Sequence, residues 1–237
     1  MIVFYHSVDE VLVPSKYIAR LLHKRGLRSR KLLILDRWVD TQRFHPGKRQ
    51  VGYYATHHGL ADEAALVKFV YVGRVAVEKN LEAFLSLDLP GTKMIIGTGP
   101  QEAELKSRFP AAQFMGLIEN GKLAAHLASA DVFVFPSLTD TFGVVQLEAL
   151  ASGVPIAAFP VTGPKDVVGG NPIGALNEDL RAACLAALNV SREACRSFAL
   201  GYSWDNSARQ FIGNLRDINA GRRAQSAQLG AAAPAHG

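Results

Sequence analysis

Apolar and polar positions follow two alternating rhythms along the chain from residue 65 onward. Short apolar runs of strand length are followed by stretches in which apolar residues recur every three or four positions, as on one helix face. The predicted strands are 65–73, 92–97, 112–116, 131–137 and 154–160, and the predicted helices are 78–87, 100–109, 120–130 and 143–152. This alternation predicts an α/β fold, a Rossmann-like parallel sheet with helices on both faces.

The first part of the chain carries a shorter version of the same pattern. Residues 10–15 and 31–38 are apolar runs, and we predict a strand in each. Residues 15–26 between them have a helical pattern, with a serine cap at the start and a glycine at the end. Residues 36–62 are polar and irregular, which predicts a linker between two domains.

Composition indicates a globular chain that favours anionic partners. The 237 residues are 49% hydrophobic and 20% charged, with a net charge of +5 and a pI of about 9.3. This balance suits phosphates, nucleic acid or a membrane surface without choosing among them. Two cysteines do not make a disulfide scaffold, and no apolar run is long enough to cross a bilayer. Since the N-terminus lacks the build of a signal peptide, we expect a cytoplasmic protein.

The turn after the predicted strand 65–73 carries two cations. Gly73 allows a tight turn, and Arg74 and Lys79 flank the start of the next helix. Free amide groups and the helix dipole favour an anion at such a place, which predicts a phosphate clamp. The alternative is that both cations are solvated charges on an ordinary surface turn.

The next two turns are rich in glycine. Gly97 and Gly99 allow a ligand to approach the backbone, but the third glycine of a dinucleotide fingerprint is missing, which argues against a nicotinamide cofactor. The same two glycines are equally explained as shaping the turn. Gly116, Leu117 and Ile118 follow the third strand, where they either hold a flat base or pack in the core.

The fourth turn and its helix, "SLTDTFGVVQLEAL", contain two carboxylates. Asp140 precedes the helix, and Glu148 lies about one and a half turns into it. Carboxylates bind hydroxyl groups, so the two acids predict sites for a polyol and a diol, while the amides around Phe142, Gly143 and Val144 suit a phosphate. The alternatives are helix capping by the first acid and an exposed or ion-paired place for the second.

Together these motifs resemble the nucleotide-binding half of retaining GT-B glycosyltransferases, the large family four. Within residues 67–168 the ordered set is "GRVAVEKN", "GTGP", "MG", "ADVFVFPS", "TDTFGVVQLEALASGVPI" and "PVTGPKDVV". Residues 11–26 resemble the family's last acceptor-domain strand and helix, and residues 36–49 resemble its interdomain linker. Residues 202–215 are similar to the C-terminal helix that packs back across the interdomain cleft.

The resemblance implies a role for each residue. Arg74 and Lys79 would neutralise the donor diphosphate as the glycosidic bond breaks. Asp140, which replaces a commoner Glu and has a shorter arm, would contact the transferred sugar. Glu148 would bind the ribose hydroxyls, and the backbone at 116–118 would hold the base. The implied catalytic residues are Arg74, Lys79 and Asp140, and the implied donor-binding residues are Gly73, Gly116, Leu117, Ile118, Phe142, Gly143, Val144 and Glu148.

The family normally has a whole α/β acceptor domain before the point at which this chain starts. The acceptor pocket and its histidine are therefore assigned to no residue here, and His6, His57 and His58 match no catalytic position. The implied parts are a remnant of the acceptor domain (1–46), a linker (47–64), the nucleotide-sugar-binding domain (65–200), a C-terminal helix packing back toward the N-terminal part (201–220) and a disordered tail (221–237).

The implied function is transfer of a hexose from a UDP- or GDP-linked sugar to a glycan or lipid, with retention of configuration. Retention in this family needs no protein nucleophile, so positioning and charge stabilisation would supply catalysis. The alternative is a non-catalytic nucleotide-sugar-binding fragment or subunit that lacks the acceptor domain.

Neither a metal nor a cofactor is expected. The acids and histidines do not gather at ligand spacing, and Cys184 and Cys195 fall in a helical region without partners. Nucleic acid is not an expected partner, because the basic residues are scattered without interleaved aromatic residues. The basic run 23–31 suits peripheral contact with an anionic membrane at the inner face, as a lipid acceptor would require.

Overall fold

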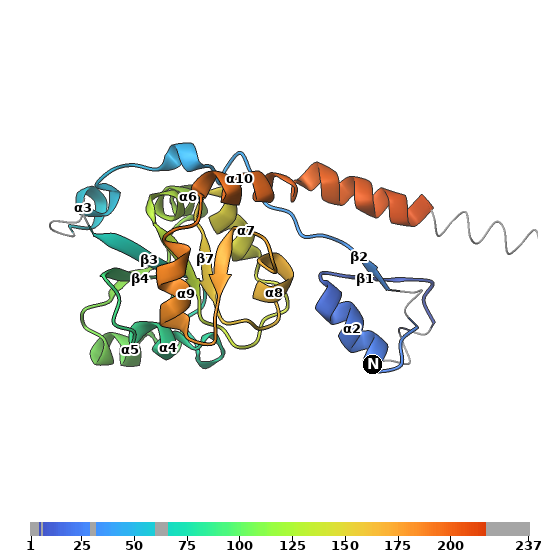
Figure 1. The fold of residues 1–237 in the computed structure, drawn as a ribbon, viewed down its shortest axis with the longest axis horizontal. Helices are drawn as coiled ribbons and strands as arrows, with labels where there is room; N and C mark the ends of the chain where they lie inside the picture. The colour runs from blue at the N-terminus through green and yellow to red at the C-terminus, as the bar shows by residue number, and fades with distance from the viewer. Residues whose placement is uncertain (1–4, 6, 29–31, 60–65, 217–237) are drawn as a thin grey trace, which may run out of the picture. The chain divides into compact units, whose positions relative to one another are not determined.

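The chain forms two compact units in the computed structural model, which describes residues 5, 7–28, 32–59 and 66–216 (Figure 1). The larger unit is residues 38–203, and the smaller unit joins residues 1–37 to residues 204–237. The predicted tail, 221–237, lies outside the described residues. Among the described residues, no helix combines the length and the apolar character needed to span a bilayer.

The larger unit is built on a six-stranded sheet in which every neighbouring pair of strands is parallel. Its strands are β3 (Val67–Val72), β4 (Gly91–Ile96), β5 (Gln113–Gly116), β6 (Val132–Phe135), β7 (Ile156–Ala158) and β8 (Gly174–Leu176). The order is β5-β4-β3-β6-β7-β8. The chain therefore builds outward from β3 to one edge, returns to the middle, and builds β6 to β8 toward the other edge.

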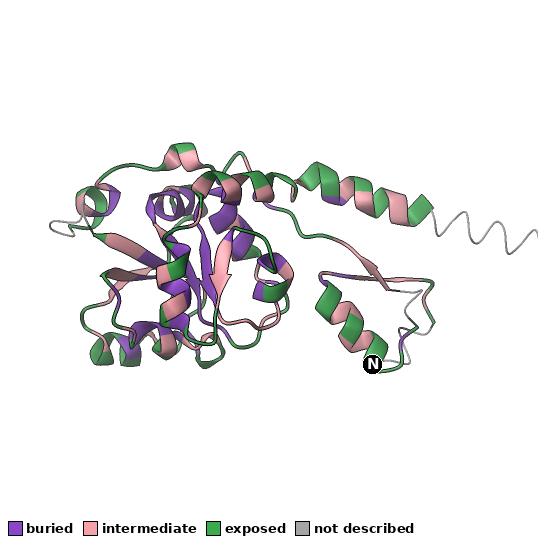
Figure 2. Cartoon of the chain, viewed as in Figure 1, coloured by how far each residue is buried: buried purple, intermediate pink, exposed green. Residues whose placement is uncertain are grey.

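Helices cover both faces of this sheet, which confirms the predicted fold class (Figure 1). One face packs against α4 (Leu81–Leu85), α5 (Glu102–Arg108) and α9 (Leu180–Ala187). The other packs against α3 (Tyr53–His58), α6 (Asn120–Ser129), α7 (Val144–Ala151) and α10 (Arg192–Leu200), with the short α8 (Pro164–Val167). Strands covered on both sides must be apolar throughout, and β6 is buried along its whole length. Figure 2 shows buried residues in the interior of the larger unit.

The helix predicted at 78–87 is divided in two. A 3₁₀ turn, η3 (Val77–Lys79), precedes α4, and Asn80 between them has a left-handed backbone with φ 51°. Its side-chain Nδ2 donates to the carbonyl of Pro136, 3.1 Å away. This contact to another loop holds Asn80 in a conformation that the helical pattern of its neighbours does not predict.

The segment predicted as a linker, 47–64, includes ordered structure. It holds most of the 3₁₀ turn η2 (Pro46–Lys48) and all of α3, whereas residues 60–65 lie outside the described residues. Tyr53 and Tyr54 of α3 are buried in the core of the larger unit. Their burial against α6 is a tertiary contact, which the polar composition of the segment did not predict.

The smaller unit has its own parallel pair, β1 (Val11–Val13) and β2 (Leu32–Ile34), joined through α2 (Lys16–Lys24). The side chain of Ser15 caps α2 by accepting from the amide of Ile18, as the sequence predicted. Residues 204–216 are helical. Within this unit the Oγ of Ser207 donates to the carbonyl of Asp36, 2.9 Å away.

Candidate functional site

The carboxyl ends of β3 and β6 lie side by side at the place where the winding of the sheet reverses. Open parallel sheets bind ligands in the crevice outside the strands at such a point. The loop that follows β3 carries the two predicted cations, and the loop that follows β6 carries the first predicted acid. The strand order therefore brings together two segments that lie about sixty residues apart in the sequence.

An ion pair links these two loops. The Nζ of Lys79 lies 2.8 Å from the Oδ2 of Asp140, and the two side chains are 25% and 17% exposed. The bond from Asn80 to the carbonyl of Pro136 is a second link between the same loops. The structure thus places two predicted catalytic side chains in direct contact, partly withdrawn from water.

Arg74 has a fixed backbone and an exposed side chain. The hydroxyl of Tyr71, on the buried β3, donates to the carbonyl of Arg74 at 2.9 Å. Burial raises the pKa of Tyr71, and the carboxylates of Asp140 and Glu78 raise it further, so the hydroxyl stays protonated and remains a donor. The Arg74 side chain is 66% exposed and lies 3.7 Å from Glu78, a weak contact. Its guanidinium is therefore accessible to a ligand.

The start of α7 is packed tightly around a glycine. Gly143 occupies the cap position with φ 74°, and a Cβ there would lie 2.8 Å from the Nε2 of Gln146 and 2.9 Å from the ring of Phe135. Gln146 is fully buried and its Nε2 donates to the carbonyl of Phe142 at 2.7 Å. Among the described residues no side chain caps the helix, so the alternative of Asp140 as its cap is wrong. The first amides of α7 are free of a side-chain acceptor, and Val144 beside them is 40% exposed.

Glu148 lies half-buried on α7. Burial raises the pKa of its carboxyl, and the nearby charge of Arg43 opposes that rise. Among the residues that the structure describes, none makes a hydrogen bond or ion pair with the Glu148 side chain, which contradicts the alternative of an exposed or ion-paired residue. A desolvated carboxylate without a partner is disposed to accept hydrogen bonds from a ligand.

The turn after β5 separates two neighbouring apolar side chains. Gly116 has φ 67°, and its carbonyl accepts from the amide of Gly97 at 2.8 Å. Leu117 is 84% exposed, whereas Ile118 packs against the core. The explanation by core packing therefore holds for Ile118 and fails for Leu117, which presents an apolar surface at the carboxyl ends of the strands.

The glycines of "GTGP" are explained by contacts between turns. A Cβ at Gly97 would lie 2.0 Å from the carbonyl oxygen of Gly73, and one at Gly99 would lie 2.2 Å from that of Val75. The amide of Val75 also donates to the carbonyl of Thr98, 2.9 Å away. These glycines let the loops after β3 and β4 pack together, so turn shaping accounts for them.

The sequence analysis missed several residues that position this site. Tyr71, Asn80 and Gln146 hold loop backbone in place. The signals were polar groups within apolar segments for Tyr71 and Gln146, and an asparagine at the start of a predicted helix for Asn80. Ser137 is fully buried where β6 ends, and its Oγ has no hydrogen-bond partner among the described residues. Gly163, φ 84°, lies against the same loop, because a Cβ there would be 3.3 Å from the carbonyl of Phe142.

Metal-binding side chains do not gather in the part of the chain that the structure describes. No group of three or more His, Cys, Asp or Glu residues there is arranged to hold an ion. Cys184 and Cys195 are buried with free thiols, and burial raises the pKa of each to about 12. Both thiols therefore act as small core side chains.

Comparison with known families gives one matching model, which is described as "Glycosyl transferases group 1" and matches residues 67–190. The matched part is slightly more than half of the chain and contains all the site residues discussed above. It ends shortly before α10.

Two relatives illustrate the similarity in sequence. A GDP-mannose-dependent alpha-mannosyltransferase of Mycobacterium tuberculosis is 31% identical over 94% of this chain and 60% of its own length. The sulfoquinovosyl transferase of Arabidopsis thaliana is 35% identical over 69% of this chain and 33% of its own length. The chain thus spans about a third to three fifths of these relatives.

Two solved structures share the fold. Sucrose-phosphate synthase from Thermosynechococcus elongatus superposes with a TM-score of 0.77 over 93% of this chain and 61% of its own, at 21% identity. The Anabaena protein HepE, solved in complex with UDP, superposes with a TM-score of 0.74 over 89% of this chain and 64% of its own, at 15% identity.

Proposed function

Because the chain belongs to the group 1 glycosyl transferases and has their GT-B architecture, we propose that its larger unit binds a nucleoside diphosphate hexose. The whole protein would transfer that hexose to a glycan or lipid with retention of configuration. The ion pair between Lys79 and Asp140 carries the proposal, because it joins a cation suited to phosphate and a carboxylate suited to sugar hydroxyls at the switch point of the sheet.

The proposed roles follow from the exposure and contacts of each group. Lys79 would exchange its carboxylate partner for the diphosphate, and Arg74 would approach the same group from its fixed backbone. The uncapped amides at the start of α7, around Phe142, Gly143 and Val144, would meet the charge that develops on the leaving nucleotide. Asp140 would then be released to bind hydroxyls of the transferred sugar.

The nucleoside would lie toward the turn after β5 and toward α7. Glu148 has a carboxylate that pairs with none of the described residues, which suits the two hydroxyls of a ribose. Gly116 leaves open space, since a Cβ there would meet nothing within 4 Å, and the exposed Leu117 offers a flat base an apolar contact. Gly73 would allow the backbone before Arg74 to approach the phosphates.

The proposed donor is a GDP- or UDP-linked hexose. GDP is supported by the Mycobacterium tuberculosis relative, whose name specifies GDP-mannose and which matches 94% of this chain. UDP is supported by the complex of HepE, which shares the fold. We further propose that donor binding needs no metal ion, so that an excess of chelator leaves nucleotide affinity unchanged.

Retention would arise from the donor itself. The leaving diphosphate would take the proton of the attacking hydroxyl on the same face of the sugar. The protein would contribute position and charge stabilisation, in keeping with a site of cations and amides.

A lipid acceptor would place the protein at the cytoplasmic membrane surface. The basic run that begins at His23 is the sequence feature that favours contact with anionic lipid.

Binding without turnover is the second candidate function. It is favoured by the position of the proposed donor-binding residues, all of which lie in the larger unit. A chain that binds the nucleotide sugar but neither hydrolyses nor transfers the sugar when acceptors are supplied would fit this second function.

The test is calorimetric titration of the chain with UDP, GDP, UDP-glucose and GDP-mannose. Lys79→Ala and Arg74→Ala remove the two proposed phosphate contacts, and Lys122→Ala removes a 72% exposed cation on α6 as the matched control. Loss of one charged contact to a diphosphate should weaken binding roughly tenfold or more, about 1.5–3 kcal/mol. The control should bind like the unaltered chain.

A nucleoside without phosphate separates the roles further. Uridine or guanosine should bind with equal affinity to the unaltered chain and to Lys79→Ala, because neither ligand reaches the cation. No nucleotide binding by the folded chain, or equal binding by all three variants, would contradict the proposed site.

A further inference from the structure

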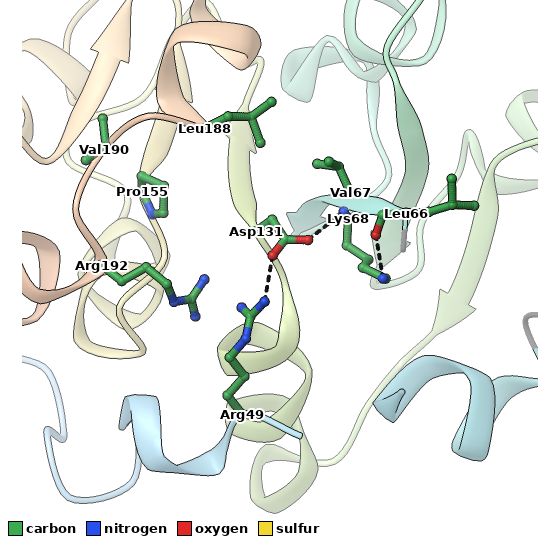
Figure 3. A pocket seen from close by; sticks show the side chains of 9 residues that line it. All are labelled: Arg49, Leu66, Val67, Lys68, Asp131, Pro155, Leu188, Val190 and Arg192. Atoms are coloured by element: carbon green, nitrogen blue, oxygen red, sulfur yellow. Dashed lines mark hydrogen bonds and ion pairs between the residues drawn. The ribbon is translucent and has the colours of Figure 1, made fainter. Parts of the chain in front are cut away.

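A cavity of about 320 Å³ lies at the opposite end of the strands from the proposed donor site (Figure 3). Val67 begins β3, while Asp131 and Pro155 immediately precede β6 and β7, so these lining residues mark the amino ends of three neighbouring strands. Its volume is at the lower end of the range for small-molecule sites, about 300–1,000 Å³.

Two arginines lie side by side in this cavity. Arg49 and Arg192 both donate to the carbonyl of Ala130, at 3.0 and 2.8 Å, and both contact the carbonyl of Ala128 at the end of α6. Figure 3 shows their guanidinium groups adjoining one another. Sharing the same two carbonyls fixes both groups, which gives the cavity a preorganised pair of cations.

Each guanidinium retains hydrogen-bonding capacity. A guanidinium has five N–H donors. Arg49 makes its third contact with Asp131, 2.8 Å away, and Arg192 makes its third with the carbonyl of Ser152, 3.4 Å away. Donors therefore remain on both groups beyond those that cap α6.

The charge of the arginine pair is incompletely balanced by the described side chains. Asp131 is the carboxylate among the lining residues, with one oxygen on Arg49 and the other accepting from the backbone amide of Lys68 at 2.9 Å. One carboxylate faces two guanidiniums. In keeping with this, burial and the charge of Arg49 together lower the pKa of Arg192 to about 10, against the opposing effects of Asp131 and Cys195.

The cavity also has an apolar wall. Pro155, Leu188 and Val190 line it, and Figure 3 places them together beside Arg192. Leu188 is 36% exposed, so a ligand can reach it from solvent. The cavity therefore combines a cationic end with an apolar wall.

We propose that this cavity binds a small phosphate monoester, with its phosphoryl group on Arg49 and Arg192 and its organic part against Pro155 and Leu188. Arginine forks match phosphate oxygens, and the monoester brings negative charge to a site with an excess of positive charge. The site is separate from donor binding and does not depend on the proposed function.

The experiment titrates the ¹⁵N-labelled chain with phenyl phosphate and, in a parallel series, with phenol. Saturable changes are expected at the amides of Val67, Asp131 and Val190 with phenyl phosphate and not with phenol. The amides of Gly73 and Gly143 report the donor site in the same spectra, so phosphate binding there is recognised separately.

A rim variant tests the charge without removing the arginines that cap α6. Leu188→Glu adds a carboxylate at the cavity wall and should weaken phenyl phosphate binding roughly fivefold or more, because like charges repel strongly at such short range. Leu200→Glu makes the same change at a 48% exposed leucine outside the cavity lining and should bind like the unaltered chain.

Several outcomes would overturn the proposal. They are an absence of saturable change at the cavity amides, changes confined to the donor-site amides, and equal affinity of the two glutamate variants. Binding of phenol as strong as that of phenyl phosphate would also overturn it, since the arginines would then play no part.

Discussion

At the scale of single residues, Glu148 combines a proposed contact with the ligand and a cost to the stability of the fold at neutral pH. Its carboxyl is half-buried, has no partner among the described residues, and has a pKa raised by burial above its ordinary value of 4.5. A raised pKa means that the folded chain holds the proton more tightly than the unfolded chain. The contribution of Glu148 to stability is therefore greatest below its ordinary pKa and is lost as the pH rises through the raised value.

We predict that Glu148→Gln stabilises the chain at neutral pH while weakening nucleotide binding. The amide removes a desolvated charge and keeps the shape, so the melting temperature should rise by about 2–4 °C for each kcal/mol gained. Binding of UDP or GDP should weaken roughly tenfold, because an amide accepts ribose hydroxyls less well than a carboxylate.

Calorimetry of both quantities checks this prediction. The gain in stability should disappear below about pH 4, where the unaltered side chain is protonated in both states. A variant that is less stable at pH 7 would contradict the predicted cost of the buried carboxylate. A variant that binds nucleotide normally would contradict its role in binding.

At the scale of elements, the glycine after β4 determines how two loops fit together. Gly97 has φ 131°, and a Cβ there would lie 2.0 Å from the carbonyl oxygen of Gly73. Gly121 in α6 is the matched control, since a Cβ there would meet nothing within 4 Å.

We predict that Gly97→Ala lowers the free energy of unfolding by roughly 3 kcal/mol, through backbone strain and the displaced loop. Gly121→Ala should raise that free energy by up to about 1 kcal/mol, because alanine restricts the unfolded chain and favours the helix. Urea unfolding measures both. Equal effects of the two substitutions would mean that the loops move apart without cost.

The contact of α3 with α6 includes a hydrogen bond between two histidines. The Nδ1 of His126 lies 2.9 Å from the carbonyl of Lys122, which can only accept, so this nitrogen carries the proton. The Nε2 of His126 is then the acceptor for the Nε2–H of His58, 2.9 Å away. Burial lowers the pKa of both rings, and the neighbouring charge of His57 lowers both further. For His126, the hydrogen bond to the carbonyl of Lys122 opposes this fall, while the charges of His58 and Lys122 add to it.

We predict that acidification loosens α3. Because the folded-state pKa values are lowered, the neutral pair stabilises the fold above the ordinary histidine pKa of 6.5, and this stabilisation is lost as the pH falls below it. Urea midpoints at about pH 7.5 and about pH 5 should differ more for the unaltered chain than for His58→Gln, which removes one ring of the pair. His23→Gln, a change in the smaller unit, should leave the difference intact, and an equal pH response in His58→Gln would exclude this role.

At the scale of the whole molecule, the core belongs to the larger unit and includes the segment before the sheet. Val39, Phe44, Tyr53 and Tyr54 are buried in the same cluster as α6 and α7. The hydroxyl of Tyr54 also donates to the carbonyl of His126 at 2.6 Å. Residues 38–58 thus contribute to the stability of the larger unit through buried side chains.

We predict that a chain of residues 38–203 folds alone and binds nucleotide, because the core of the larger unit is contained within it. A chain of residues 66–203 should be less stable by more than about 5 kcal/mol, since it loses several large buried side chains. Differential scanning calorimetry measures and compares the stabilities of the two chains. Similar stability of both chains would show that residues 38–65 do not contribute to the stability of the larger unit.

Much of the fold was predictable because short-range pattern carries it. Local pattern predicts a strand for each apolar run and a helix for each periodic segment, as observed for β3, β4, β6, α5, α6 and α7. The alternation of these elements indicates parallel strands. The pattern did not predict the break at Asn80 or the burial of Tyr53 and Tyr54. Those features depend on partners that are distant in sequence, Pro136 for the first and α6 for the second.

The sequence by itself determined which residues have suitable chemistry: cations after β3, glycines after β4, and acids around the start of α7. Residue type and distance from a strand end are local properties, so they can be read directly from the sequence. The tertiary structure alone decided that Lys79 pairs with Asp140, that Glu148 has no partner among the described residues, and that Arg49 adjoins Arg192. Each of these depends on strand order and helix packing, which bring distant segments to within hydrogen-bonding distance or keep them apart.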